Sequence, residues 1–428
     1  MGIAYLHYVQ MRTDISPDVS QTYHIRKQRR FILKVSSVIT EYNPFHNGHK
    51  YQLNKVSEET GCDYKVIIMS GNFVQRGQPA IMDKYTRTKM ALSCGADLVL
   101  ELPVSFASSS AEFFAKGAIS ILDSCSVIDT LCYGVENNEH GLIREIASVL
   151  HDEPQLFSDI LKKYMKSGMS YPAARTKSLL HVLRGYDTVC ESAVSEIISS
   201  PNNILAVEYE KALLDTKITG FPIKRIGSGY HDTDHMKSFP SATAIRNLLS
   251  SSGAGLTENM IPEECSAIID EYTKDHSFVF ENDISELLYY KLLSLKNEGY
   301  RNFSDCNEEL SRKISKNLYK YKNFTQFCEL IKSKNYTYSR ISRVLIHIML
   351  DIKDDDLLQN PYIRILGFKK SAAPLLHAIK KEASAPIITK VADAPYELIS
   401  NDIFAADIYN RLCKNDATNE FTHGPVIM

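Results

Sequence analysis

The sequence predicts an α/β fold, in which a Rossmann-like parallel-sheet domain is followed by a mainly α-helical C-terminal domain. Up to about residue 255, short apolar runs alternate with amphipathic segments of 10 to 15 residues. Strands separated by helices of this length predict a parallel sheet with right-handed crossovers. Beyond residue 255 the strand signal fades and helical periodicity dominates.

Each predicted strand is a short apolar run. The first four cover residues 31–40, 64–71, 96–103 and 128–136, and the run at 64–71 suits a strand buried on both faces. Helices are predicted between them at 48–61, closed by Gly61, at 83–95, capped by Asp83, and at 110–125. Further on we expect amphipathic helix over 139–190, a strand at 221–226, and a Ser/Thr-rich turn that opens a short helix within 238–251.

These elements predict three parts of the chain. Residues 35–265 are expected to form the α/β domain and residues 266–428 the helical domain. Residues 1–34 lack this patterning, which predicts either a disordered leader or a start assigned too early in the gene. The basic cluster RKQRR at 26–30 leaves a third interpretation open, an arm that touches RNA.

The composition is that of an ordinary globular protein, with 44% hydrophobic and 23% charged residues. No run approaches the roughly 20 apolar residues that span a bilayer, and no secretory signal is apparent, so we expect a cytoplasmic protein without a membrane partner. The nine cysteines lack C-x-x-C pairs and zinc spacing, which predicts reduced, buried thiols and no metal centre. The net charge of −2 argues against indiscriminate binding to nucleic acid but permits a local basic face.

The stretch ITEYNPFHNGHK, residues 39–50, follows the first predicted strand and carries the strongest chemical signal. A helix that starts near Asn47 or Gly48 would direct free backbone N–H groups and its positive dipole end at a ligand above the sheet, as in many phosphate sites. His46 and His49 at this helix start can both donate hydrogen bonds to one phosphate group. Ordinary surface histidines are one alternative, and a metal pair is another, although no third ligand lies nearby in the sequence.

Three further polar turns fall at the carboxyl ends of predicted strands, where open α/β sheets bind their ligands. They are SGNFVQRG at 70–77 with Asn72, Gln75 and Arg76, YGVE at 133–136 with Gly134, and the segment from Arg225 to Arg246 with Ser241 and Thr243. Each also has an ordinary interpretation, as a surface loop, a strand-terminal glycine or a simple helix cap. Together with the two histidines they predict a site for a nucleoside triphosphate, with Ser241, Thr243 and Arg246 as candidate phosphate ligands.

The motif PFHNGH with the downstream SATAIR resembles the H-x-G-H nucleotidylyltransferase superfamily. Six segments narrow the resemblance to the bacterial tRNA(Met) cytidine acetate ligase family over residues 35 to about 415: EYNPFHNGH, MSGNFVQRGQPAIMDKYTRTKMAL, GADLVLELP, EFFAKGAISIL, SPNNILAVEY and YIRILGFKK. The resemblance implies a nucleotidylyltransferase domain that uses ATP and acetate, forms acetyl-adenylate, and transfers the acetyl group to N4 of the wobble cytidine in elongator tRNA(Met).

The resemblance also implies which residues hold ATP. His46 and His49 are expected to be catalytic, and the remaining positions are Ile39, Thr40, Glu41, Tyr42, Asn43, Pro44, Phe45, Asn47, Gly48, Lys50, Tyr51, Gln52, Gly134, Asn202 and Arg225. Asn203 is the alternative to Asn202. Val135 stands where the family usually has serine, which leaves a backbone contact intact and puts a serine contact in question.

The implied reaction fits these residue types. Adenylation gives acetate a good leaving group, and the attacking carboxylate is already anionic, so this step needs no strong general base. The site must hold two anions together and neutralise charge at the phosphates. His46, His49, Arg225 and the helix start can do so, with Mg2+ expected to bridge the phosphates.

Positive charge and tyrosines accumulate in the C-terminal part. Residues 291–343 contain 12 Lys/Arg against 5 Asp/Glu, and tyrosines occur at 289, 290, 300, 319, 321, 336 and 338. Arg340 and Arg343 on a helix predicted over 338–350, together with Lys369 and Lys370, are candidate tRNA contacts. The alternative is a solvated helical face.

Two other functions stay open. One is an enzyme of the same superfamily that adenylylates a small cofactor precursor, and the basic C-terminal part argues against it. The other is a non-catalytic RNA-binding protein that kept the fold, and the intact pair of His46 and His49 argues against that.

Overall fold

The computed structural model describes residues 33–136, 139–183, 191–225, 240–252, 259–414 and 419–428. Lys34–Met428 belong to one compact unit. Nearly all of the predicted leader, and with it the basic cluster at 26–30, lies outside the described residues. No helix in the described ranges is long and apolar enough to cross a membrane.

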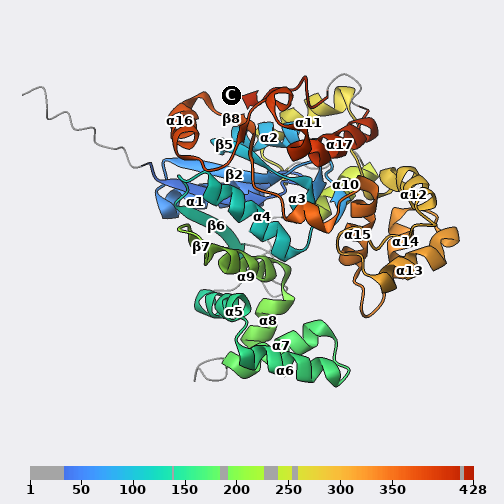
Figure 1. Ribbon diagram of the computed structural model, residues 1–428. Coiled ribbons are helices and arrows are strands. Elements are labelled where there is room, and N and C mark those ends of the chain that lie inside the picture. Colours follow the sequence, from blue (N-terminus) through green and yellow to red (C-terminus); the bar gives the residue numbers. More distant parts are fainter. Residues whose placement is uncertain (1–32, 137–138, 184–190, 226–239, 253–258, 415–418) are drawn as a thin grey trace, which may run out of the picture. The chain divides into compact units, whose positions relative to one another are not determined.

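A parallel sheet forms the centre of this unit (Figure 1). The parallel strands are β1 (Val35–Thr40), β2 (Tyr64–Ser70), β5 (Leu98–Leu102), β6 (Thr130–Val135) and β7 (Thr219–Lys224), in the spatial order β5-β2-β1-β6-β7. This confirms the predicted parallel sheet. The chain runs outwards from β1 to β2 and β5, then returns to the other side of β1 with β6. The carboxyl ends of β1 and β6 therefore flank the point where the strand order reverses, which is where such sheets bind ligands.

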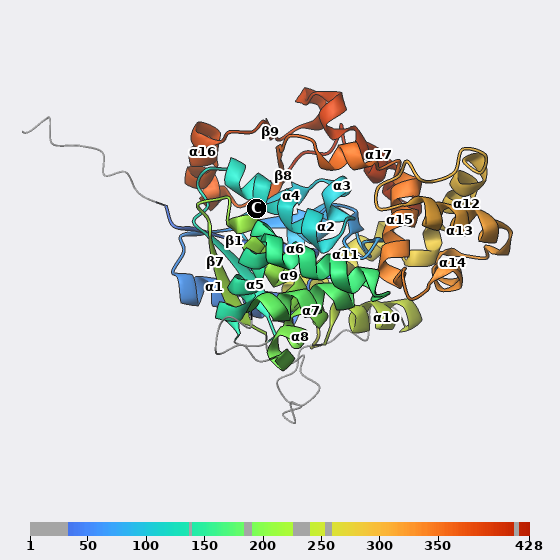
Figure 2. The same ribbon diagram turned by 60° about the horizontal axis from the view of Figure 1, so that its bottom comes forward.

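Helices join these strands, and the three predicted at 48–61, 83–95 and 110–125 are confirmed, whereas those at Val104–Ala107 and Pro201–Leu213 were not predicted. The joining helices are α1 (Asn47–Thr60), α2 (Lys84–Ser93), α3 (Val104–Ala107), α4 (Ala111–Ser124) and α9 (Pro201–Leu213). Gly61 ends α1 in the left-handed conformation, with φ of 60°, and the Asp83 carboxylate caps α2 by accepting the N–H groups of Tyr85 and Thr86. A helical insertion precedes α9 and packs against it (Figure 2): α5 (His140–Asp152), α6 (Gln155–Lys166), α7 (Tyr171–Leu183) and α8 (Glu191–Ser199).

The turn after β2 is a short hairpin of β3 (Phe73–Val74) and β4 (Gln78–Pro79). Asn72, for which the sequence suggested no role in the fold, is buried here and accepts the backbone N–H of Lys84 at 2.9 Å. Gly77 has φ of +73°, and a Cβ atom there would lie 2.3 Å from the backbone nitrogen of Arg343. This glycine lets the hairpin touch the C-terminal helices directly.

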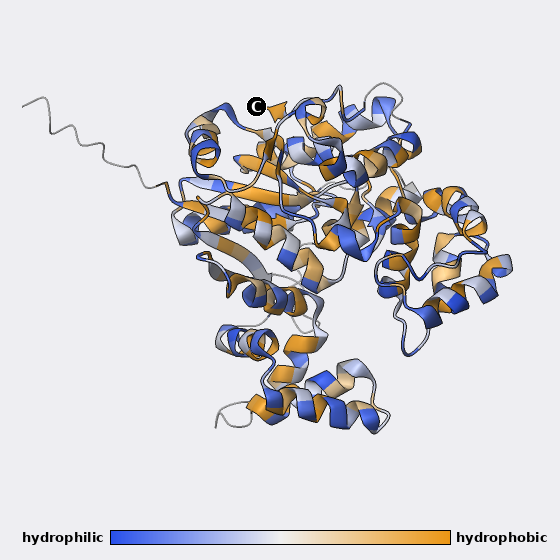
Figure 3. Ribbon diagram, in the orientation of Figure 1, coloured by the Kyte–Doolittle hydropathy of each residue, from blue (hydrophilic) through white to orange (hydrophobic). Residues whose placement is uncertain are grey.

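The C-terminal part is mainly helical, as predicted. Its helices are α10 (Ala242–Ser252), α11 (Glu263–Asp275), α12 (Ser285–Ser294), α13 (Glu308–Asn317), α14 (Phe324–Ile331), α15 (Tyr338–Leu350), α16 (Ala373–Glu382) and α17 (Tyr396–Leu412), with short 3-10 turns at Glu281–Ile284, Leu318–Lys320, Asp354–Leu357, Lys370–Ala372 and Val391–Asp393. Apolar residues of α12–α15 are buried and share one core with Phe73 of the hairpin. Figure 3 shows apolar and polar stretches on these same helices.

The chain then returns to the sheet, which the sequence did not predict. β8 (Ile363–Phe368) pairs antiparallel with β5 and parallel with β9 (Ile387–Ile388) and β10 (Val426–Ile427). The central sheet contains strands from both sides of the expected boundary between residues 265 and 266. That boundary between two domains remains a prediction.

A buried charge network joins β8 to the rest of the sheet. Lys84 and Arg364 alternate with Glu101 and Glu420, at N–O distances of 2.7 Å for Lys84–Glu101, 2.9 Å for Lys84–Glu420 and 3.0 Å for Arg364–Glu101. None of the four side chains is more than 4% exposed. Two cations facing two carboxylates balance the charge inside the core, which buried ions require.

Candidate active site

His46 and His49 begin α1 as a reciprocal cap. The Nδ1 atom of His46 accepts the Gly48 N–H at 3.0 Å, and the Nδ1 atom of His49 accepts the His46 N–H at 3.2 Å. The two rings stack with their centroids 3.7 Å apart. Both Nδ1 atoms are therefore acceptors, so in a neutral ring the proton must lie on Nε2.

Burial keeps both rings neutral. Burial and, to a smaller extent, the nearby Arg225 lower the pKa of His46 to about 4. Burial, His46 and Arg225 together hold the pKa of His49 well below its usual range. At neutral pH the site thus presents two neutral Nε2–H donors, which can bind an anionic oxygen without first being charged.

The backbone at the start of α1 differs from the expectation. Its N–H groups are not free: Asn47 donates to the Met260 carbonyl at 3.0 Å, Gly48 donates to His46 Nδ1, and His49 and Lys50 donate to the His46 carbonyl at 2.9 and 3.2 Å. The expectation of free N–H groups was wrong because the side-chain cap and the carbonyl of Met260 satisfy them. The hydrogen-bond donors left for a ligand are those of the imidazoles.

Arg225 and Asn202 lie beside the histidines. The guanidinium of Arg225 donates to Asn202 Oδ1 at 3.3 Å, and Asn202 Nδ2 donates to a Glu136 oxygen at 2.6 Å. A Cβ atom on Gly134 would lie 3.2 Å from Cγ of Arg225, so the glycine leaves room for this side chain. Asn203, the alternative to Asn202, is fully buried and accepts the Glu136 N–H at 3.1 Å, which gives it a role in the fold.

The first turns of α10 contact the turn between β1 and α1, which carries the histidine motif. Arg246 donates to the backbone carbonyl of Asn43 at 2.8 Å and to Thr243 Oγ1 at 3.1 Å. Ser241 Oγ accepts the Ala244 N–H at 3.2 Å and caps the helix. The structure thus brings Arg246 to the histidine motif, while Ser241 is engaged in capping. Residues 226–239 of the fourth predicted turn lie outside the described residues.

A cleft of about 560 Å³ opens beside His49. Predicted site residues on its wall are Ile39, Thr40, Glu41, Tyr42, Asn43, His49 and Asn202. Tyr42 Oη and Asn43 Nδ2 are buried without a hydrogen-bond partner in the described part of the chain, and the Tyr42 side chain belongs to the hydrophobic core beneath the cleft.

Other predicted residues lie away from this cleft. Pro44 and Phe45 are buried beneath the turn, and Asn47 and Lys50 turn towards the start of α11, where Lys50 pairs with Glu264 at 2.7 Å. Tyr51 and Gln52, further along α1, are half-buried and do not line the cleft. Their role in ATP binding stays a prediction.

Several cleft residues lie outside the set that the family resemblance implied, and two of them belong to the polar turn at 70–77 that the sequence did associate with the nucleotide site. Gln75 and Arg76 come from the hairpin, and Ser339 and Arg343 come from α15. The polar hairpin loop was a signal for the first two. Nothing in the sequence indicated that a helix 300 residues after β1 would line the same cleft.

The candidate tRNA contacts divide into two groups. Arg340 and Arg343 both form ion pairs with Asp305, at 3.0 and 2.9 Å. Both guanidinium groups are therefore already paired with a carboxylate of the protein itself. Lys369 and Lys370 follow β8, and the helix after them, α16, lies apart from α12–α15 in both ribbon views. Their role in tRNA binding remains a prediction.

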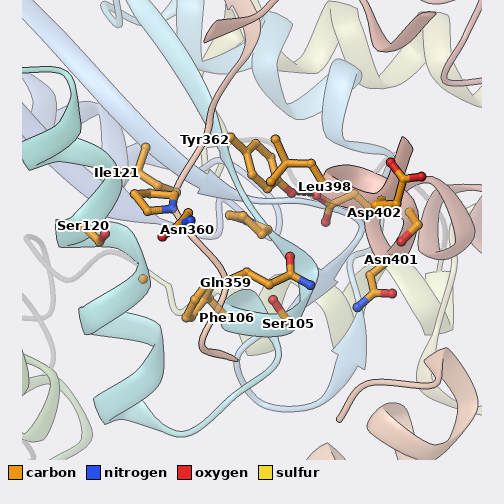
Figure 4. A pocket seen from close by; sticks show the side chains of 15 residues that line it. Ser105, Phe106, Ser120, Ile121, Gln359, Asn360, Tyr362, Leu398, Asn401 and Asp402 are labelled. Carbon is orange, nitrogen blue, oxygen red and sulfur yellow. Dashed lines mark hydrogen bonds between the residues drawn. The ribbon is translucent and has the colours of Figure 1, made fainter. Parts of the chain in front are cut away.

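A second cavity is too small for a substrate. It lies between α4 and α17, beside Tyr362 and Asp402 (Figure 4), and its volume of about 20 Å³ is close to that of one water molecule. The carboxylate of Asp402 accepts hydrogen bonds there from the hydroxyl of Tyr362 and the N–H of Val104. The described residues contain no cluster of three or more His, Cys, Asp or Glu side chains that could hold a metal ion.

Known proteins resemble the chain over nearly its whole length. The family model for HIGH Nucleotidyl Transferase matches residues 33–423. The tRNA(Met) cytidine acetate ligase of Clostridium novyi is 38% identical over 92% of this chain and all of its own, and that of a Thermoanaerobacter species is 40% identical over 90% and 96%. The crystal structure of Thermotoga maritima TmcAL bound with alpha-thio ATP has a TM-score of 0.84 and 31% identity, covering 92% of this chain and 99% of that one. The chain belongs to the HIGH nucleotidyl transferases and, among them, to the tRNA(Met) cytidine acetate ligase family.

Proposed function

We propose that this protein is an ATP-dependent ligase that acetylates N4 of the wobble cytidine in elongator tRNA(Met) by way of acetyl-adenylate. The observation that carries the adenylation half is the capped histidine pair, which presents two neutral Nε2–H donors beside Arg225 at the switch point of the sheet. Membership of the family carries the choice of acetate and tRNA, because relatives 38% and 40% identical bear this name.

In the first step, an oxygen of acetate attacks the α-phosphorus of ATP, and the bond to pyrophosphate breaks. Negative charge grows on the phosphate oxygens in the transition state. The Nε2–H groups of His46 and His49 and the guanidinium of Arg225 stabilise that charge, and Asn202 holds Arg225 in position. The described residues of the cleft wall include a single carboxylate, Glu41, so they do not form a metal site of their own. Magnesium would enter as part of the Mg–ATP substrate.

The second step needs a surface for the tRNA. A depression of about 580 Å³ on α13 and the loop before α15 is lined by Arg312, Lys313, Lys316 and Lys334, which we call the α13 basic face. Within the described residues, Lys316 and Lys334 have no ion pair, unlike Arg340 and Arg343. The α13 basic face therefore supports a phosphate-binding role more directly.

Few of the tyrosines in this region are available for stacking on bases. Tyr300 and Tyr336 are buried in the helical core, whereas Tyr290 and Tyr319 are 74% and 71% exposed. We therefore assign base stacking to Tyr290 and Tyr319.

Exchange of labelled pyrophosphate into ATP tests the adenylation half without tRNA. We expect exchange that requires acetate. Exchange that requires a different small acid or a phosphate ester would favour a small-molecule adenylyltransferase. Binding of tRNA without any exchange would favour a non-catalytic RNA-binding protein.

A further inference from the structure

Glu41 places a carboxylate in the wall of the cleft without an ion-pair partner among the described residues. It directly follows β1, and its backbone carbonyl accepts a hydrogen bond from Arg87 at 2.7 Å. One carboxylate oxygen accepts the Gln75 N–H at 3.0 Å, which orients the group. No lysine or arginine in the described chain lies within salt-bridge distance of it, although the carboxylate is largely withdrawn from solvent.

Burial raises the pKa of the Glu41 carboxyl above its usual value. The Gln75 N–H and three arginines lower the pKa but do not cancel this effect; the arginines are Arg246 of α10, Arg76 of the hairpin and Arg87 of α2. The remaining ionisable groups on the cleft wall are His49 of α1, Tyr42 after β1, Tyr209 of α9 and Arg343 of α15. A carboxylate with a raised pKa is a better proton acceptor than a free one.

The second half of the proposed reaction requires such an acceptor. The nitrogen N4 of cytidine attacks the acetyl carbonyl carbon, a C–N bond forms, and the bond from that carbon to the AMP oxygen breaks. The amine begins with two protons and ends as an amide with one. One proton must therefore leave N4 as AMP departs.

The other groups on the described cleft wall cannot take this proton. Both histidines use Nδ1 to accept backbone N–H groups, so their free Nε2 atoms already carry hydrogen. Burial raises the pKa values of Tyr42 and Tyr209 far above neutrality, which keeps both phenols protonated, and the arginines are cations. Among the described residues that line the wall, Glu41 is the only carboxylate.

We infer that Glu41 contacts the exocyclic amine of the cytidine and accepts its proton during acetyl transfer. This inference rests on the proposed function, because a cytidine amine is the acceptor it serves. The proton passes from N4 to a Glu41 oxygen and afterwards to solvent. Adenylation needs no proton acceptor, because its nucleophile is already an anion.

Glu41→Gln separates the two halves of the reaction. Glutamine keeps the volume of the side chain and an oxygen that can accept the Gln75 N–H, but it cannot accept a proton from N4. Because Glu41 is also an expected ATP contact, acetate-dependent pyrophosphate exchange is measured at saturating ATP, where weaker ATP binding appears as a higher KM for ATP; the exchange also shows that the variant is folded. Acetyl transfer from preformed acetyl-adenylate to tRNA should fall by about 100-fold or more, the usual size of a general-base contribution. Glu112→Gln is the matched control, since Glu112 lies next to Ala111 of the cleft wall but pairs with Lys211 instead.

The pH profile distinguishes a base from a structural carboxylate. Wild-type acetyl transfer should rise with pH through the Glu41 pKa and then level off, whereas Glu41→Gln should show a low rate without this rise. Equal losses in both half-reactions, or an unchanged pH profile in the variant, would overturn the inference. If the wild type lacks acetate-dependent exchange, the proposed function itself fails, and that result is distinct from a failure of Glu41.

Discussion

The imidazole rings of His46 and His49 lie stacked at the first turn of α1, with an angle of 23° between their planes. Each ring accepts a backbone N–H group at its Nδ1 atom, and each Nε2–H group remains available to donate to a ligand. The hydrogen bonds that cap the helix therefore also fix the tautomer that the chemistry needs.

Substitution of His46 tests this double role. His46→Ala removes the cap acceptor and the Nε2–H donor, so we expect the unfolding free energy to fall by about 1 kcal/mol and acetyl-adenylate formation to be lost. His46→Asn restores a cap acceptor without the donor. Its stability should recover towards the wild type, but its pyrophosphate exchange should not. Both variants should bind tRNA almost as the wild type does, and exchange at the wild-type rate in His46→Asn would contradict the assignment.

Stability should depend on pH through the same residues. The folded pKa of His46 is about 4, that of His49 is also lowered, and an unfolded histidine has a pKa of about 6.5. Between these values the unfolded chain binds more protons, so this stabilisation is complete above about pH 6.5 and is lost as the pH falls towards 4. Each histidine contributes a slope of at most about 1.4 kcal/mol per pH unit. Denaturant unfolding across this range should give a shallower slope for His46→Asn, and identical slopes would argue against a neutral His46.

Gly77, in the β3–β4 hairpin, should not tolerate a side chain. Its φ is +73°, and an added Cβ atom would lie 2.6 Å from Cα of Arg343, which is backbone and cannot swing away. We expect Gly77→Ala to lower the unfolding free energy by about 2 kcal/mol or more. Gly141→Ala is the control, because Gly141 lies in α5 with open space around it and alanine there should stabilise by about 0.5–1 kcal/mol. Similar effects for the two variants would mean that the contact between hairpin and α15 is loose.

The sequence predicted the part of the site that is local in the chain. Asp83, Gly61 and the start of α1 are short-range features, and the parallel sheet follows from the spacing of apolar runs. Three features could not be predicted, because they depend on contacts between distant residues: the burial of Arg364, the pairing of Arg343 with Asp305, and the place of Arg343 in the cleft. Arg364 looks unsuited to a buried strand until Glu101 and Glu420 surround it. The pairing of Arg343 with Asp305 and its place in the cleft depend on how α15 meets the hairpin.

The α13 basic face should carry tRNA affinity. Replacing Lys313, Lys316 and Lys334 by alanine should weaken tRNA binding and reduce the steepness of its salt dependence, because fewer phosphate counterions are released. Pyrophosphate exchange should be unchanged. The matched control is Lys162→Ala with Lys163→Ala on the exposed face of α6. Filter binding over a series of salt concentrations measures both quantities, and an unaltered slope in the triple variant would exclude this surface.

The most direct test of the function is a nucleoside analysis. The protein is incubated with ATP, radiolabelled acetate and elongator tRNA(Met), and the RNA is then digested to nucleosides. We predict label in N4-acetylcytidine, with AMP and pyrophosphate formed in equal amounts, and no label when the wobble cytidine is replaced by uridine. The absence of labelled acetylcytidine, from protein that binds both ATP and the tRNA, would contradict the account.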